Sequence, residues 1–401
     1  MVSFTPFRGS VIKSDFTRRV PAPAFDSMSR SQRSEYLATH PESYTLVTRS
    51  PSDGGPEDQA DLARLIELGG QALQRIRDAG AFHEMSGPSF FLYRLKLGDL
   101  IQTGIVGLVD TQDYLEGRVK RHERVRANRA AHLSHHFETL GVQSSPIAVS
   151  YRSDPIIRQR LDDVLDRTDP IVSFISGDGL DQTVWAITDQ DDLDYLSTAF
   201  EPHDFYIMDG HHRAAAAGQL LERIGPERAS KMLGVAFADD RVNIEPFHRR
   251  IMLNDDVDID MFSSSLRDLL RLVPDARIEH ELPDEGQIGV HLDGQWWRGE
   301  MPETSSDSPI DALGPVRLQK QVIGPVFGLD PEQSAGQIRY FLDTANRGEL
   351  AQRIDRRNVL FVLRPITAAE VFAVADAGLD MPPKSTYVTP KPRSGVFLRE
   401  F

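Results

Sequence analysis

The stretch at residues 205–217 constrains the fold of this chain more than any other feature. Residues 205–208 are Phe-Tyr-Ile-Met, a short apolar run with two aromatic side chains that is typical of a buried strand. Asp209 and Gly210 end this run, and the four alanines at residues 214–217 favour a helix. Strand and helix patterns also occur along the rest of the chain, so the sequence predicts a mixed α/β (α+β) fold.

The junction between this strand and this helix carries the polar residues Asp209, Gly210, His211, His212 and Arg213. The start of a helix presents unpaired backbone N–H groups and the positive end of the helix dipole, which favour a bound anion. Arg213 adds a planar guanidinium that suits phosphate oxygens, and the two histidines add further donors. Asp209 is predicted to bind magnesium or to accept a proton. The alternative is an ordinary turn whose histidines bond only to the local backbone.

Composition excludes several classes of protein and of site. A length of 401 residues is enough for two domains, and a formal net charge of -15 argues against a nucleic-acid-binding surface. The absence of cysteine excludes disulfides, thiolate metal sites and cysteine nucleophiles, and it fits a reducing cytoplasm. No stretch has the length of a membrane span or the pattern of a signal peptide. We therefore expect a cytoplasmic protein whose partners include neither nucleic acid nor membrane.

A charged segment follows a predicted hairpin. Residues 90–97 and 101–109 have strand patterns separated by a Gly-Asp pair, which is a hairpin signal. The Lys-Arg-His-Glu segment at residues 120–123 comes soon afterwards. On its own, such a charge run is usually a solvated surface. Directly after a hairpin, it can also deliver His122 and Glu123 to a cleft, and both are candidate catalytic residues.

Two further clusters occur later in the chain. Residues 242–250 form an extended segment that ends in a basic cluster, and a strand there can direct His248 and Arg249 at the phosphate site. Near the end, residues 381–395 are rich in proline, which favours a fixed extended loop over a strand. This loop carries three residues suited to a phosphate or carboxylate, namely Lys384, Ser385 and Thr386.

The character of the sequence changes after Asn254, where polar motifs of the kind described above become sparse. This change predicts a first domain at residues 1–254, which binds the phosphate, and a smaller α+β domain at residues 255–401. The proline-rich loop at residues 381–395 is expected to return to the cleft of the first domain.

Three of these motifs together carry a resemblance. The segments Lys-Arg-His-Glu (120–123), Asp-Gly-His-His-Arg (209–213) and Met-Pro-Pro-Lys-Ser-Thr (381–386) resemble those of a large bacterial and archaeal family, a domain of unknown function. That family is described as similar to free-serine kinases, which have a ParB/sulfiredoxin-like fold and phosphorylate L-serine with ADP or ATP. In that fold a Gly-x-x-Arg turn holds a nucleotide phosphate, and this turn corresponds to residues 210–213 here. The chain departs from the family pattern at Ala214, where a tyrosine is usual.

The resemblance implies a small-molecule kinase that transfers a phosphoryl group from ADP or ATP to free L-serine or a related hydroxy amino acid. Its cofactor would be Mg²⁺ at Asp209, and Glu123 or Asp26 would accept the hydroxyl proton. Asp26, Lys384, Ser385 and Thr386 would bind the substrate. Two alternatives stay open: a nucleotide-binding regulator without an acceptor site, and another enzyme that processes phosphate, such as a hydrolase. The sequence also leaves open whether the chain forms a homodimer.

Overall fold

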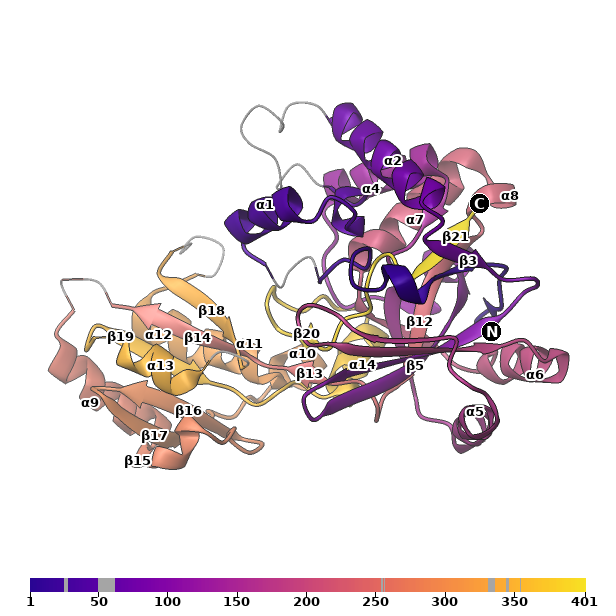
Figure 1. Ribbon diagram of the computed structural model, residues 1–401. Coiled ribbons are helices and arrows are strands. Elements are labelled where there is room, and N and C mark those ends of the chain that lie inside the picture. Colours follow the sequence, from indigo (N-terminus) through magenta and orange to yellow (C-terminus); the bar gives the residue numbers. More distant parts are fainter. Residues whose placement is uncertain are drawn as a thin grey trace. The chain divides into compact units, whose positions relative to one another are not determined.

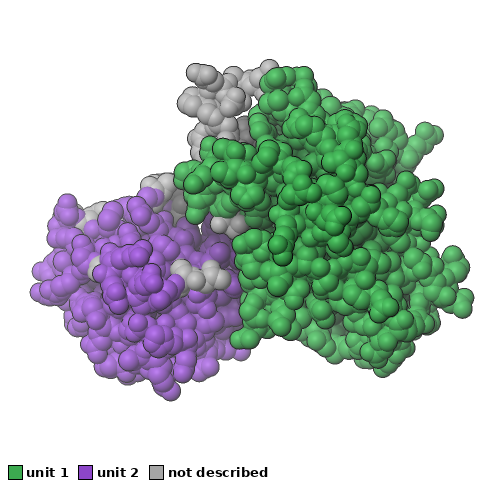
Figure 2. All heavy atoms as spheres, in the orientation of Figure 1, with its two compact units in different colours: residues 1–243, 390–401 green, residues 244–389 purple. Residues whose placement is uncertain are grey.

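The computed structural model describes residues 1–24, 28–49, 62–253, 255, 257–330, 336–343, 346–353 and 355–401. The candidate residue Asp26 and the expected boundary residue Asn254 lie outside this part of the chain. The chain divides into two compact units, drawn in different colours in Figure 2. Unit 1 comprises Met1–Asn243 and Pro390–Phe401, and unit 2 comprises Ile244–Thr389. No helix in the described ranges is long and apolar enough to cross a membrane.

The main sheet of unit 1 is mixed. Strand β11 runs parallel to β6, and β12 runs parallel to β8, whereas the remaining pairs are antiparallel. The predicted hairpin is present as β4 and β5, which confirms that part of the sequence reading. In order across the sheet, the strands are β6 (Val119–Lys120), β11 (Phe205–Asp209), β8 (Ile147–Tyr151), β12 (Lys231–Ala238), β5 (Leu100–Asp110), β4 (Phe90–Leu97), β10 (Asp181–Ile187) and β9 (Val172–Ile175), with β1 (Phe4–Thr5) paired to β5.

Helices and a small second sheet complete unit 1. In Figure 1, α2, α4 and α7 form one group, and α5 and α6 lie together away from it. The helices are α1 (Arg30–Thr39), α2 (Leu62–Asp78), α3 (Thr111–Leu115), α4 (Ala127–Leu140), α5 (Pro155–Arg167), α6 (Gln190–Phe200), α7 (His211–Ile224) and α8 (Pro226–Ala229), with 3-10 turns at Ser14–Phe16 and Tyr44–Leu46. The small sheet has the order β3 (Phe82–Glu84), β2 (Ser10–Ile12), β21 (Phe397–Glu400) and β7 (Val142–Gln143).

An aromatic cluster anchors strand β11 in the core of unit 1. The ring of Phe4 lies 5.3 Å from that of Phe90, 5.1 Å from that of Phe200 and 5.5 Å from that of Phe205, measured between centroids. All four side chains are buried. The packing is close, because a Cβ added at Gly107 would lie 2.7 Å from the Phe90 ring and 2.8 Å from the Phe4 ring. Burial of this kind makes β11 a rigid support for whatever follows its last residue.

Unit 2 is built around an antiparallel sheet of its own. Its core includes Phe262, Leu266, Val290 and Phe361, which come from a helix and two strands. The sheet has the order β15 (Val273–Pro274), β17 (Gln295–Glu300), β16 (Gln287–Leu292), β19 (Asn358–Val362), β14 (Phe247–Met252) and β18 (Ile338–Leu342). The helices are α9 (Ile259–Leu270), α10 (Pro309–Ala312), α11 (Gly314–Leu318), a π-helical turn (Gln319–Ile323), α12 (Gly324–Phe327), α13 (Arg347–Gln352) and α14 (Ala368–Asp376), with a 3-10 turn at Ala276–Glu279. Strands and helices in both units confirm the predicted mixed α/β class.

Unit 2 is an insertion within unit 1. Its first strand, β13 (Ile244–Glu245), pairs antiparallel with its last strand, β20 (Tyr387–Val388), so the chain enters and leaves unit 2 at the same place. In unit 1 the buried amide of Gln102 holds both connecting segments. Its oxygen accepts a hydrogen bond from the backbone N–H of Asn243 at 3.4 Å, and its nitrogen donates to the backbone oxygen of Pro390.

The division of the chain thus differs from the expected one in two respects. The first part of unit 1 ends at Asn243, and residues 390–401 belong to unit 1. The reason for the first difference is that β14, which precedes Asn254, pairs with β18 and β19 of the later chain. The proline-rich segment also contains the short strand β20, whereas the sequence favoured a loop. Strand pairing across a long sequence separation has no local signal.

Candidate functional site

Gly210 makes the turn between β11 and α7. Its φ of 96° lies in the left-handed region that favours glycine, and no side chain caps the start of α7. A Cβ at this position would also lie 2.7 Å from a terminal nitrogen of the Arg213 guanidinium. Glycine is therefore required twice, for the backbone conformation and for the close approach of Arg213. The uncapped start of a 14-residue helix leaves its first backbone N–H groups directed at the turn.

Two cations bracket the carboxylate of Asp209. The Lys391 ammonium lies 2.8 Å from Oδ1, and a terminal nitrogen of Arg213 donates to Oδ2. The other terminal nitrogen of Arg213 donates to the backbone oxygen of Pro146 at 2.6 Å. The three charged side chains are 23%, 13% and 21% exposed for Asp209, Lys391 and Arg213, so solvent reaches this cluster only in part.

The charges of this cluster decide the ionisation of Asp209. Burial by itself would raise the pKa of the Asp209 carboxyl, but Lys391 and Arg213 outweigh burial and hold that pKa well below its usual range. A carboxyl with so low a pKa stays ionised at neutral pH and is a poor proton acceptor. The geometry therefore argues against proton transfer, which was one of the two roles that the sequence suggested for Asp209, and it favours a role in holding Lys391 and Arg213 in place.

The loop that follows β6 lies across the turn. The backbone N–H of His122 donates to Nε2 of His211 at 3.5 Å, and that of Arg126 donates to Nε2 of His212 at 3.2 Å. His211 Nδ1 lies 3.3 Å from the Glu123 carboxylate. This arrangement follows from the sheet, because β6 is parallel to β11 and both strands end at the same edge. The structure thus brings His122 and Glu123 to the Asp-Gly-His-His-Arg turn.

His122 and Glu123 differ in their surroundings. His122 is 2% exposed, and its Nδ1 has no hydrogen-bond partner among the described residues. Burial lowers the pKa of His122 well below its usual value, so the ring is neutral. The Glu123 side chain is 50% exposed, and the hydrogen bond from His211 lowers the pKa of its carboxyl. Glu123 is therefore an ionised carboxylate with access to solvent beside a buried, neutral imidazole.

The C-terminal segment of unit 1 supplies a residue that sequence reasoning missed. Lys391 reaches Asp209, although the sequence reading selected Lys384 as the lysine of the site. The segment is held along its length, since Arg393 pairs with Asp178 and the backbone N–H of Gly395 donates to Ser144 Oγ at 2.7 Å. One local signal was present, because Lys391 stands between two prolines that restrict the backbone on both sides.

The remaining predicted residues with described positions belong to unit 2. His248 is buried, with Nε2 2.9 Å from Asp343 and with Nδ1 accepting from the backbone N–H of Leu363 at 3.3 Å. The Arg249 guanidinium lies 5.4 Å from the centre of the Tyr340 ring. The structure thus groups the phosphate candidates Gly210, His211, His212 and Arg213 with Asp209, His122 and Glu123 in unit 1, and it places His248, Arg249, Lys384, Ser385 and Thr386 in unit 2.

Within unit 2 the proline-rich loop makes local contacts. The Lys384 ammonium lies 5.2 Å from the centre of the Phe247 ring, and the Ser385 hydroxyl donates to the backbone oxygen of Pro382 at 2.8 Å. Lys384 has a positive φ of 62°, which is uncommon for a residue other than glycine.

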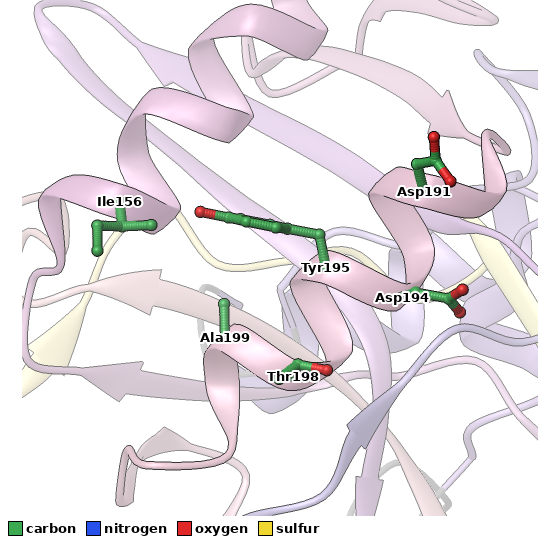
Figure 3. Close-up of a pocket in the computed structure, with 6 residues that line it drawn as sticks. All are labelled: Ile156, Asp191, Asp194, Tyr195, Thr198 and Ala199. Carbon is green, nitrogen blue, oxygen red and sulfur yellow. The ribbon is translucent and has the colours of Figure 1, made fainter.

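No metal cluster marks the site in the part of the chain that the structure describes. In the described ranges, no group of three or more His, Asp or Glu side chains is placed to hold a metal ion. An open groove of about 550 Å³ lies between α5 and α6, where Tyr195 extends toward Ile156 (Figure 3). It contains none of the predicted residues, so we place the site at the start of α7 on chemical grounds. The groove is lined by Ile156, Asp191, Asp194, Tyr195, Thr198 and Ala199.

Comparison with solved structures finds chains of low sequence identity and low TM-score. SbnI with a C-terminal truncation, from Staphylococcus aureus, is 12% identical over 73% of this chain and 85% of that chain, with a TM-score of 0.37. A mutant free serine kinase in complex with ADP is 15% identical over 72% of this chain and 90% of that chain, with a TM-score of 0.35. A conserved hypothetical protein from Pyrococcus furiosus is 14% identical over 72% of this chain and 92% of that chain, with a TM-score of 0.33.

Comparison at the level of sequence families is more specific. No curated protein matches this chain. The model of a family described as "Protein of unknown function (DUF1015)" matches residues 4–322, which include both the turn after β11 and the loop after β6. This match spans most of the 401 residues, so the chain belongs to the DUF1015 family.

Proposed function

We propose that this protein is a small-molecule kinase that transfers a phosphoryl group from ADP or ATP to the hydroxyl of free L-serine or a related hydroxy amino acid. One observation carries the proposal: two cations, Arg213 and Lys391, flank Asp209 at the uncapped start of α7. A donor phosphate placed there meets backbone N–H groups, a helix dipole and fixed cations together. The family that carries these polar motifs is described as similar to free-serine kinases, whose Gly-x-x-Arg turn corresponds to residues 210–213, and this resemblance supports phosphoryl transfer to a hydroxyl.

The charge of the cluster suits a phosphate. Arg213 and Lys391 bring two positive charges to the start of α7, and the negative charge of Asp209 lies between them. Phosphoryl transfer depends mainly on positioning and on neutralising charge, with little covalent chemistry for the protein to perform. Asp209 contributes by holding both cations in place, and Gly210 lets the backbone approach closely.

Glu123 is the residue that we propose as the acceptor of the hydroxyl proton. Its carboxylate is ionised, half exposed and oriented by His211, whereas the oxygens of Asp209 both face cations. A general base must reach the proton that it takes, and exposure gives a substrate hydroxyl that access. We propose that His122 fixes His211 through its backbone N–H and so sets the position of Glu123.

Mg²⁺ fits this site only if the phosphates of the nucleotide serve as further ligands. Mg²⁺ typically binds one or two carboxylates together with substrate phosphates, and it supplies neutralisation of phosphate charge. Asp209 could serve as a ligand only by exchanging Lys391 or Arg213 for the metal ion, because each of its oxygens faces one of these cations.

The acceptor amino acid requires partners for its own charges. We propose that Lys384, Ser385 and Thr386, which belong to unit 2, bind a carboxylate, and that Asp26 binds a positively charged group of the acceptor, on the chemistry of these residue types alone. His248 and Arg249 are better explained as structural, because they contact Asp343 and Tyr340 within unit 2.

The test is an incubation of purified protein with Mg²⁺, ADP or ATP, and a panel of hydroxy amino acids, followed by mass spectrometry of the products. We expect phosphorylated L-serine or a close analogue. Asp209→Asn keeps the size of the side chain and removes its charge, so it should abolish turnover in a folded protein. Asp110→Asn is the matched control, because Asp110 is equally exposed at 23% and pairs with Lys231. Binding of nucleotide without phosphorylation of any acceptor would contradict the kinase proposal.

A further inference from the structure

Lys391 is the one residue of the site that comes from the C-terminal segment, and neither the Asp-Gly-His-His-Arg turn nor the earlier loop includes it. Residues 209 and 391 are 182 positions apart in the sequence, and all of unit 2 lies between them. The ammonium of Lys391 nonetheless lies 2.8 Å from Asp209 Oδ1. The closure of a surface loop does not by itself explain this contact.

The position of Lys391 is set from both sides by unit 1. The amide of Gln102, which is buried in β5, donates to the backbone oxygen of Pro390. On the other side, the buried Arg393 pairs with Asp178, and the backbone N–H of Ala22 donates to Ser394 O at 2.9 Å. A cation held this way loses little conformational freedom when an anion binds, which favours binding.

Lys391 and Arg213 contact different oxygens of the same carboxylate. Two cations that contact the two oxygens of one carboxylate lie close enough to bind neighbouring anionic groups, such as adjacent phosphates of one nucleotide. The start of α7 is adjacent, and the buried His122 beside His211 leaves its Nδ1 without a partner in the described part of the chain. These features together mark a site for a group with more than one negative charge.

Arg213 and Lys391 are suited to contact different phosphates of one nucleotide. Arg213 belongs to the first turn of α7, where the helix dipole and the backbone N–H groups can hold one phosphate. Lys391 approaches from a separate segment and adds a charge that a single phosphate at the helix start does not need. A nucleoside diphosphate or triphosphate uses both cations, whereas a nucleoside monophosphate uses mainly the first.

We propose that Lys391 binds the terminal phosphate of a nucleoside di- or triphosphate and thereby makes the site prefer these ligands over a nucleoside monophosphate. This inference rests on the proposed nucleotide site at the start of α7 and adds the residue that selects among nucleotides. A purely structural role for Lys391 would instead involve only its contacts within the protein, among them the ion pair with Asp209.

Calorimetric titration of ADP and AMP separates these roles. The wild-type protein should bind ADP more tightly than AMP. Lys391→Met should weaken ADP binding by about 10- to 100-fold, the range for loss of a hydrogen bond to a charged group. Its AMP binding should change by less than about threefold, because a nucleoside monophosphate uses mainly Arg213 and the start of α7. Lys391→Arg should keep most of the preference, because it keeps the charge.

The control is Lys231→Met, which removes another partly buried lysine of unit 1 that pairs with Asp110 at 3.0 Å. Its ADP-to-AMP ratio should equal that of the wild type. If Lys391→Met does not fold, Lys391→Gln retains a hydrogen bond to Asp209 without the charge and should show the same loss of ADP preference. An unchanged ratio in folded Lys391→Met or Lys391→Gln overturns this inference and leaves the kinase proposal standing. Wild-type protein that binds neither nucleotide overturns both.

Discussion

At the scale of single residues, Arg213 has two partners on opposite sides of the turn. It donates to Asp209 at the end of β11 and to the backbone oxygen of Pro146, which precedes β8. Its guanidinium also lies directly against Gly210. Arg213 therefore joins two strands of the main sheet to the start of α7, in addition to any contact with a ligand.

Arg213→Ala is expected to weaken ADP binding by about 1.5–3 kcal/mol, the range for a hydrogen bond to a charged group. Calorimetric titration measures this loss. Arg223→Ala is the control, because Arg223 lies in the same helix and pairs with Glu138 at 2.8 Å. Unchanged ADP affinity in a folded Arg213→Ala variant would mean that the phosphate binds elsewhere.

Gly210→Ala should destabilise the protein by about 1–3 kcal/mol, the cost of a residue held in an unfavourable backbone region. The alanine Cβ would also meet the Arg213 guanidinium at 2.7 Å. Urea unfolding measures the change. Gly177→Ala should have almost no effect, because no atom lies within 4 Å of the added Cβ and its backbone is not in the left-handed region. Equal stability of the two variants would contradict the role given to Gly210.

Protonation of His122 makes the free energy of unfolding depend on pH. Its pKa in the folded state is lowered by burial, so below about pH 6.5 the unfolded chain binds a proton that the folded protein does not. The contribution of neutral His122 to the free energy of unfolding is thus fully present above the pKa that His122 has in the unfolded chain, and it is lost as the pH falls below that value. Denaturant unfolding between pH 6.5 and 5 should show a loss of about 1.4 kcal/mol per pH unit for each such histidine.

His122→Gln should reduce this slope. Part of the slope should remain, because burial also lowers the pKa of His136. His135→Gln is the control, since the His135 side chain is 56% exposed. A His122→Gln variant with the wild-type slope would show that His122 is not buried in its neutral form.

At the scale of elements, the loop after β6 and the turn after β11 form one assembly. Hydrogen bonds from the backbone at His122 and Arg126 to two consecutive histidines align the loop with the start of α7. The helix is itself fixed against α4, where Phe137 packs with Ala216 and Leu220. A change in the core beneath β11 should therefore be transmitted to the whole assembly.

Phe205→Ala tests the support that β11 provides. Phe205 is fully buried and contacts Phe4 and Phe200, so its truncation should lower the free energy of unfolding by about 3–5 kcal/mol. Thermal and urea unfolding measure this effect. Ile175→Ala, at a side chain that is 62% exposed, should change stability by less than about 0.5 kcal/mol. A Phe205→Ala variant as stable as Ile175→Ala would refute the anchoring role.

At the scale of the whole molecule, unit 1 is completed only by the last residues of the chain. Strand β21 lies between β2 and β7, and Val396, Phe397 and Leu398 are buried. The residues of unit 2 are thus inserted between two segments of unit 1. Gln102 binds the backbone of both connecting segments where they leave unit 1.

Truncation after Thr389 should therefore destabilise unit 1, although it leaves the first 243 residues intact. Loss of three buried apolar side chains costs about 1.5–3 kcal/mol each, and the pairing of β21 is lost as well. We expect a melting temperature at least about 10 °C lower, or insoluble protein, by differential scanning calorimetry. A truncated chain that melts like the full chain would contradict the assignment of residues 390–401 to unit 1.

Much of the local structure could be predicted from the sequence. The run ending at Asp209, the turn at Gly210 and the helix after it are recognisable because apolar patterning, a glycine and helix-forming alanines act over a few residues. The β4–β5 hairpin follows from the same kind of information. The mixed α/β class and the family could also be predicted, since both depend on such motifs in order along the chain.

The tertiary structure alone decided which lysine completes the cluster at Asp209 and where the chain divides. Lys384 and Lys391 both lie in the proline-rich stretch, and the prolines beside each lysine restrict the backbone without showing which lysine reaches Asp209. The choice depends on β21 pairing with β2 and β7, and on Gln102 binding the backbone on both sides of unit 2. Backbone groups are the same in every residue, so a pairing between distant segments leaves no mark in the sequence of either segment.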